Sequence, residues 1–254
     1  MPQSLRALCL VLLAAPLLLG GEGRSRAAKT HARRKPGGPV VIMRIGRVKI
    51  YRQQSRIYFK SGLQIDVDGA PTAYHPNDEE ALDTVKNAMK NPRANRPRWV
   101  GVVTDTGRPS GTPLLQGPDD PAPGYYISKT AYEVPGFADT DPRHYLDATR
   151  INYVVVPMKL AARFKTLNLL GSRARITNLE TGAVCEGLVG DLGPNHKIGE
   201  ASLAFARALQ CGACSARFGI DRRIFLYEVF PGEPAKGFGL EEAPPEDASS
   251  VATP

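Results

Sequence analysis

The 254-residue sequence lacks the motifs that indicate the common cofactors. It contains no glycine-rich phosphate loop and no convincing cluster of metal ligands, so we expect an activity that needs neither a cofactor nor a metal. It also has no internal repeat, which argues against a repeat architecture. Beyond the first twenty residues no apolar run is long enough to span a bilayer, so we expect no stable membrane insertion of the mature protein.

Cysteine is scarce, with four residues in the whole chain. Cys9 would leave with an N-terminal leader, and Cys185, Cys211 and Cys214 would remain. The last two could form a tight disulfide loop in an oxidising compartment, and no second pair of ligands supports a zinc site. A redox motif of the thioredoxin kind would need a βαβ context that this part of the sequence does not have.

Positive charge is concentrated at the N-terminus, within a formal net charge of +8. Residues 1–23 have the layout of a secretory signal peptide, with Arg6 before an apolar run and small residues at its end. The alternative is that residues 1–23 are not cleaved and anchor the protein in a membrane. Residues 24–39 are expected to form a basic, disordered linker, and residues 233–254 an acidic, disordered tail. We expect a secreted protein, extracellular or periplasmic, with no nucleic-acid partner.

Short runs of β-branched and aromatic residues dominate the chain between these ends. Their alternation and their turn residues predict antiparallel strands, including a hairpin. Residues 77–90 predict the clearest helix, because Asn77 can cap it and apolar residues recur on one face. Many strands and few helices indicate a β-rich α+β fold built around a β-barrel. The predicted strands cover residues 40–45, 48–51, 56–59, 63–67, 99–103, 151–157, 174–179, 183–189 and 224–230.

The segment LVGDLGPNHKIGEASLAFARAL, residues 188–209, carries the candidate catalytic pair. It predicts a strand that ends at Val189, a turn over residues 190–194, a loop and a helix that begins near Glu200. Asp191 and Glu200 bracket a loop whose shape is restricted by glycine and proline. Hydrolysis of a glycosidic bond needs two such acids, one to protonate the leaving oxygen and one to activate water or attack. The alternative is a plain helix entry in which both acids are structural.

Other polar and aromatic residues could contact a ligand. Asp66 and Asp68 are two positions apart, so they share a face if the strand continues through them. Their spacing could begin a calcium loop, but the other ligands of that pattern are missing. Adjacent tyrosines at positions 125 and 126 would point to opposite faces of a strand, one into the core and the other, Tyr126, toward a flat ligand such as a sugar ring.

Four stretches together resemble the chitosanases of glycoside hydrolase family 75, in order and over most of residues 40–232. They are SGLQIDVDGAPTAYHP (61–76), PAPGYYISKTAY (121–132), YVVVP (153–157) and the segment around the candidate pair. The resemblance implies a secreted, endo-acting, inverting enzyme that cleaves β-1,4-glucosamine linkages in chitosan. Asp191 and Glu200 match the essential acids of that family, with Glu200 as general acid and Asp191 as base, although the roles could be exchanged. Asp66, Asp68, Tyr74 and Tyr126 would bind substrate.

The same segment is similar to that of double-psi β-barrel proteins, which include lytic transglycosylases, barwin-like proteins and expansins. This implies a six-stranded double-psi-like barrel with a few peripheral helices, acting as a monomer on a polysaccharide. Two alternatives stay open: a non-catalytic barrel that binds cell-wall glycan, and a peptidoglycan-cleaving enzyme of the transglycosylase type. The mildly basic body of the chain would suit an anionic wall polymer better than a polycation.

Overall fold

A computed structural model describes residues 37–92 and 98–238 of the chain. The predicted signal peptide, residues 24–36 of the predicted linker and residues 239–254 of the predicted tail lie outside the described residues. The remainder is rich in strands and contains a few short helices.

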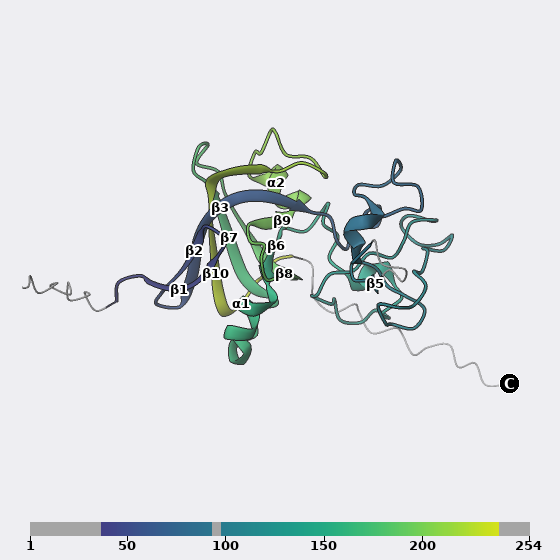
Figure 1. Ribbon diagram of the computed structural model, residues 1–254, viewed down its shortest axis with the longest axis horizontal. Coiled ribbons are helices and arrows are strands. Elements are labelled where there is room, and N and C mark those ends of the chain that lie inside the picture. Colours follow the sequence, from purple (N-terminus) through teal and green to yellow (C-terminus); the bar gives the residue numbers. More distant parts are fainter. Residues whose placement is uncertain (1–36, 93–97, 239–254) are drawn as a thin grey trace, which may run out of the picture. The chain divides into compact units, whose positions relative to one another are not determined.

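Six strands form a closed barrel, as the sequence predicts (Figure 1). Their order is β3-β10-β7-β8-β6-β9, and β9 returns to pair with β3. Two neighbouring pairs, β3–β9 and β6–β8, are parallel, and the other pairs are antiparallel. The barrel strands are β3 (Arg56–Asp66), β6 (Tyr153–Pro157), β7 (Ser172–Asn178), β8 (Val184–Gly193), β9 (Glu200–Ser202) and β10 (Ile220–Pro234).

Strand β3 is long enough to join the barrel to a hairpin. The hairpin strands β1 (Val40–Ile45) and β2 (Val48–Gln53) pair with each other, and β2 pairs with the first residues of β3. The last residues of β3 pair instead with β9, which closes the barrel. The sequence predicts two separate strands here, over residues 56–59 and 63–67, but the structure has one continuous strand. Gly62 lies in its middle, where a Cβ would be 2.2 Å from the carbonyl oxygen of Ile220 on β10.

Alternating side chains fill the interior of the barrel. The interior cluster takes apolar residues from every barrel strand, such as Phe59, Val154, Ile176, Val189 and Tyr227. A second apolar cluster covers the outer face of β6 and β8, where Tyr153, Val155 and Leu188 pack against residues from the long segment between β3 and β6. The polar groups described below lie on this outer face.

Helices are short and peripheral. Helix α1 (Met158–Arg163) follows β6 and helix α2 (Leu203–Ala208) follows β9, and the two lie at opposite ends of the barrel (Figure 1). The 3₁₀ helices are η1 (Val85–Ala88), η2 (Pro142–His144) and η3 (Lys165–Leu167), and β4 (Met89–Lys90) with β5 (Arg98–Trp99) forms a small second sheet. Cys211 and Cys214 form a disulfide bond, as their spacing allows.

The helix predicted over residues 77–90 is wrong. This segment forms turns, then η1 and β4. The Arg217 side chain donates to the carbonyl oxygens of Asp78, Ala81 and Leu82, which a regular helix would use for its own backbone bonds. The Asp78 carboxylate also accepts from the N–H of Val85 at 2.7 Å. Side-chain bonds to backbone groups compete with the backbone bonds of a helix.

Two boundaries predicted around the candidate pair are also wrong. Strand β8 does not end at Val189 but continues to Gly193, because β6 pairs with it as far as Pro157. Glu200 does not open a helix but begins β9, since both β3 and β6 pair with it there. Helix α2 begins only at Leu203, where the side chain of Ser202 caps it.

Candidate active site

Asp191 and Glu200 lie on two strands that flank the same residue. On one side of β6, Val155 pairs with Asp191 of β8, and on the other side it pairs with Glu200 of β9. Directly paired residues point to the same face of a sheet. The two carboxylates therefore project from one face, with their backbones two inter-strand spacings, about 9.6 Å, apart.

A β-bulge gives Asp191 this orientation. Val189 pairs with Val154 and Asp191 pairs with Val155, so Gly190 is an extra residue in β8. In a regular strand, alternation from the interior residue Val189 would direct Asp191 into the barrel, and the bulge turns it to the outer face instead. Residue 190 must be glycine, because a Cβ there would lie 2.6 Å from Cβ of Tyr153.

The backbone of Ala131 fixes the Asp191 carboxylate. Oδ1 of Asp191 accepts from the N–H of Ala131 at 2.7 Å. Burial raises the pKa of Asp191 to about 6, and the nearby Glu200 carboxylate adds to the increase. The backbone N–H groups of Leu192 and Ala131 and the Lys129 ammonium act in the opposite direction on this pKa. Asp191 is thus a half-buried carboxyl that loses its proton just below neutral pH.

Glu200 is reached through a rigid loop and retains contact with solvent. Gly199, just before it, has a φ of +96°, and a Cβ there would lie 2.3 Å from Oγ of Ser61, so only glycine fits. Oε1 of Glu200 lies 3.3 Å from Nζ of Lys197, and its side chain is 16% exposed. On the side toward β8, a Cβ on Gly193 would lie 3.3 Å from Oε2. The Glu200 carboxylate therefore packs directly against Gly193, and a larger residue at this position would crowd it.

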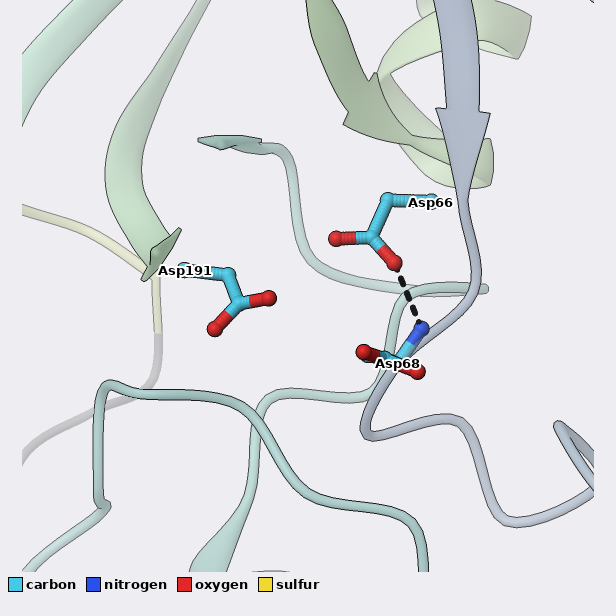
Figure 2. Close-up of side chains that lie close together, drawn as sticks. All are labelled: Asp66, Asp68 and Asp191. Carbon is cyan, nitrogen blue, oxygen red and sulfur yellow. Dashed lines mark hydrogen bonds between the residues drawn. The ribbon is translucent and has the colours of Figure 1, made fainter. Parts of the chain in front are cut away.

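Asp66 and Asp68 face Asp191 from the end of β3 (Figure 2). One carboxylate oxygen of each of the three residues lies within 4.8 Å of the others. The Asp66 carboxylate also accepts from the N–H of Asp68 at 2.9 Å, which fixes the turn between them. The sequence predicts that Asp66 and Asp68 share one site, and the structure brings them together with Asp191.

Burial and mutual repulsion favour protons on this cluster. Burial raises the pKa of Asp66 well above its usual range, and the Asp191 carboxylate raises it further. The pKa of Asp68 is likewise raised well above its usual range, first by burial and then by Asp66. Carboxylates packed this closely cannot all be ionised at low cost, so at neutral pH the cluster shares protons.

Two buried tyrosines orient the cluster. The hydroxyl of Tyr74 donates to Oδ1 of Asp68 at 2.7 Å, and Tyr74 is 3% exposed. The hydroxyl of Tyr153 donates to the backbone carbonyl of Asp68 at 2.8 Å. Both tyrosines belong to the second apolar cluster, so they hold the acids from beneath. A substrate contact by Tyr74 stays a prediction.

The backbone of Tyr126 contacts Tyr74, one of the two tyrosines beneath the acids. Its N–H donates to the carbonyl of Tyr74 at 2.9 Å, and its half-buried ring packs at 5.9 Å from the ring of Trp99. Tyr125 instead packs against His75. The ring of Tyr126 is thus engaged by a neighbouring aromatic residue, and its predicted contact with a sugar is untested.

The described residues that could hold a cation are Asp66, Asp68 and Asp191. Carboxylate oxygens suit Ca²⁺ or Mg²⁺, and at sites of this kind water supplies the remaining oxygen ligands. The Asp68 carboxylate also accepts from Tyr74, and that of Asp191 from the N–H of Ala131. Carboxyl groups this close together are also suited to holding and transferring protons.

Sequence reasoning missed three groups that shape the site: the bulge residue Gly190, the hydroxyl of Tyr153 and the amide of Ala131. Tyr153 lies in the run YVVVP, in which every residue is buried, so alternation does not separate the two faces. Ala131 contributes only its backbone, which no side-chain pattern can indicate. The extra residue in β8 is visible only in its pairing with β6.

The chain matches no protein-family model and no curated protein. Within residues 37–92 and 98–238, no helix has the length and apolar character needed to cross a membrane. The acids on the outer face of the barrel are therefore the basis for assigning a function.

Proposed function

We propose that this chain is a secreted, endo-acting glycoside hydrolase that cleaves β-1,4-glucosamine linkages in chitosan with inversion. The observation that carries the proposal is the pairing of Asp191 and Glu200 with the same residue, Val155. Inverting glycosidases hold their two carboxyl groups about 6.5–9.5 Å apart, so that water fits between the base and the sugar. Backbones about 9.6 Å apart, with both side chains on one face, are compatible with that separation.

Asp191 acts as the base in this mechanism. The backbone N–H of Ala131 donates to its side chain, and an ionised carboxylate satisfies this donor. With a pKa of about 6 it is ionised at neutral pH and still basic enough to accept a proton. It removes a proton from water, and the hydroxide oxygen attacks the anomeric carbon from the face opposite the leaving group.

Glu200 acts as the general acid. It protonates the glycosidic oxygen while the bond from that oxygen to the anomeric carbon breaks, and the remaining chain leaves as an alcohol. Its exposed edge gives substrate access to this carboxyl group.

Asp66 and Asp68 supply negative charge beside the base, which suits a polycationic substrate. The protonated amines of chitosan would replace protons shared within the cluster, because a bound cation lowers the cost of ionising neighbouring carboxylates. This negative charge is local, whereas the net charge of the whole chain is positive.

Product analysis tests the proposal. The protein without residues 1–23 is incubated in ¹⁸O-labelled water with chitosan and, separately, with purified peptidoglycan, and the products are examined by mass spectrometry. We expect chitosan oligomers that carry ¹⁸O at the reducing end. Anhydro-muropeptides from peptidoglycan alone would indicate transglycosylase chemistry, and binding without any cleavage would indicate a glycan-binding barrel.

A further inference from the structure

A pocket of about 300 Å³ lies beside Glu200. Its walls come from the β1–β2 hairpin, the loop before β9, and strands β3 and β10. In strand order Asp191 lies on one side of β9 and the β3 and β10 residues of this pocket on the other. The pocket thus continues the candidate site past Glu200, in the direction away from Asp191 and Val155.

Two acidic residues line this pocket, and Asp221 is the one that does not belong to the candidate pair. Gln64 of β3 pairs with Glu200 of β9, and its Nε2 donates to Oδ1 of Asp221 at 2.9 Å. Asp221 is held next to Gln64 by the pairing of Ile220 with Leu63. Asp221, Gln64 and Glu200 therefore line one pocket from three adjacent strands.

The contacts of Asp221 leave it able to bind a cation. It is exposed, and among the described residues only its Oδ1 accepts a hydrogen bond. Gln64 is a neutral donor, so it orients the carboxylate without neutralising it. Ile45 and Val48 form the apolar base of the same pocket, and both are buried in the barrel core.

We propose that Asp221 binds the protonated amine of a glucosamine unit, in a subsite on the Glu200 side of the cleaved bond. This inference rests on the proposed function and names a specificity residue that neither motif nor resemblance indicates. Lys197 lines the same pocket, and its ammonium lies next to Glu200. Repulsion from Lys197 disfavours an amine at that end and directs it to the Asp221 end.

The test compares Asp221→Asn with Asp119→Asn. The introduced amide oxygen can still accept from Gln64, so the first substitution removes the charge and keeps the hydrogen bond. Asp119 is an exposed acid on a loop outside the pocket, and its replacement makes the same change in net charge. Kinetics are measured on fully deacetylated chitosan oligomers and on highly acetylated oligomers of the same length, at constant ionic strength.

We expect Asp221→Asn to raise KM for the deacetylated oligomers about fivefold to tenfold, since a charge-assisted hydrogen bond is lost. Its kcat should stay within about twofold, because the residue contacts a remote sugar and not the reacting atoms. On the acetylated oligomers, which carry an uncharged amide, its KM should match that of Asp119→Asn.

The outcomes separate the inference from the function on which it rests. Failure of the unmodified protein to cleave or bind any chitosan oligomer would overturn both. Normal cleavage with the same KM in Asp221→Asn and Asp119→Asn would overturn the subsite alone. A similar rise in KM on charged and acetylated oligomers would also overturn it, because the effect would then be one of shape and not of charge.

Binding provides a second readout in the Glu200→Gln background, where turnover is blocked. Titration calorimetry with a glucosamine hexamer should show affinity about fivefold to tenfold weaker when Asp221→Asn is added. Equal affinity in the single and double variants would contradict the proposal.

Discussion

Gly190 and Tyr153 approach so closely that a Cβ on residue 190 would lie 2.6 Å from Cβ of Tyr153. We therefore expect Gly190→Ala to force a shift in β8 or β6 and to lower the free energy of unfolding by about 1–3 kcal/mol. The initial rate should fall by more than the loss of folded protein accounts for, because the bulge orients Asp191. Urea unfolding and initial rates measure the two effects.

Gly212→Ala is the matched control for that substitution. No heavy atom lies within 4 Å of a Cβ at Gly212. Its stability and activity should match those of the unmodified protein. Normal activity in a folded Gly190→Ala variant would show that the bulge does not need glycine.

Asp191→Asn should stabilise the protein at neutral pH. The folded-state pKa of about 6 lies above the usual value of 3.8, so the native state binds more protons than the unfolded state between these values. Stability of the unmodified protein should therefore fall as pH rises from 4 to 6, by up to about 3 kcal/mol. The amide in the variant does not titrate, so its advantage should be largest above pH 6 and vanish below pH 4.

Chemical unfolding at pH 3.5, 5 and 7.5 tests this linkage. The comparison is the difference in unfolding free energy between Asp191→Asn and the unmodified protein at each pH. A difference that stays constant across the three values would contradict the raised pKa of Asp191.

Glu200→Gln should fold normally and lose activity on chitosan by roughly 10²–10⁴-fold, since proton transfer is removed. A substrate with a good leaving group, such as an aryl chitooligoside, needs little protonation and should restore much of the rate. Asp191→Asn should lose activity to a similar extent and should not recover with that substrate. Recovery by Asp191→Asn in place of Glu200→Gln would exchange the two roles.

Glu228 links three strands of the barrel. It is 3% exposed, pairs with Arg56, and accepts from Nε of Arg175 at 2.8 Å. Glu228→Ala would leave two arginines without their shared partner, so we expect a loss of about 3 kcal/mol in unfolding free energy.

Glu233→Ala is the control for Glu228. Its pair with Arg173 is more open to solvent, with the Glu233 side chain 46% exposed, so we expect a loss of about 0.5 kcal/mol. Urea denaturation measures both variants. Equal losses would contradict the role assigned to the buried pair.

The barrel could be predicted from the sequence because its strands alternate or are continuously apolar over short stretches. Residues 172–178 alternate between buried and half-buried positions, as expected for a strand with one face toward the barrel interior. The helix predicted over residues 77–90 does not form. Its pattern depends on neighbouring residues, whereas Arg217, far along the chain, donates to the carbonyl oxygens of this segment.

The site could be predicted only in part. Asp191 and Glu200 stand out by spacing, but their common neighbour Val155 depends on strand pairing between distant segments. Asp66 and Asp191 are far apart in sequence, and nothing local indicates that their carboxylates meet. Glu200 looked like the start of a helix because it precedes one, and pairing with two strands overrides that preference.

The stereochemistry of cleavage tests the central claim most directly. Proton NMR during the first minutes of hydrolysis of a glucosamine hexamer records which anomer forms before mutarotation. Inversion by Asp191 and Glu200 predicts that the α-anomer appears first from the β-linked substrate. Initial release of the β-anomer, or no cleavage of the hexamer, would contradict the account.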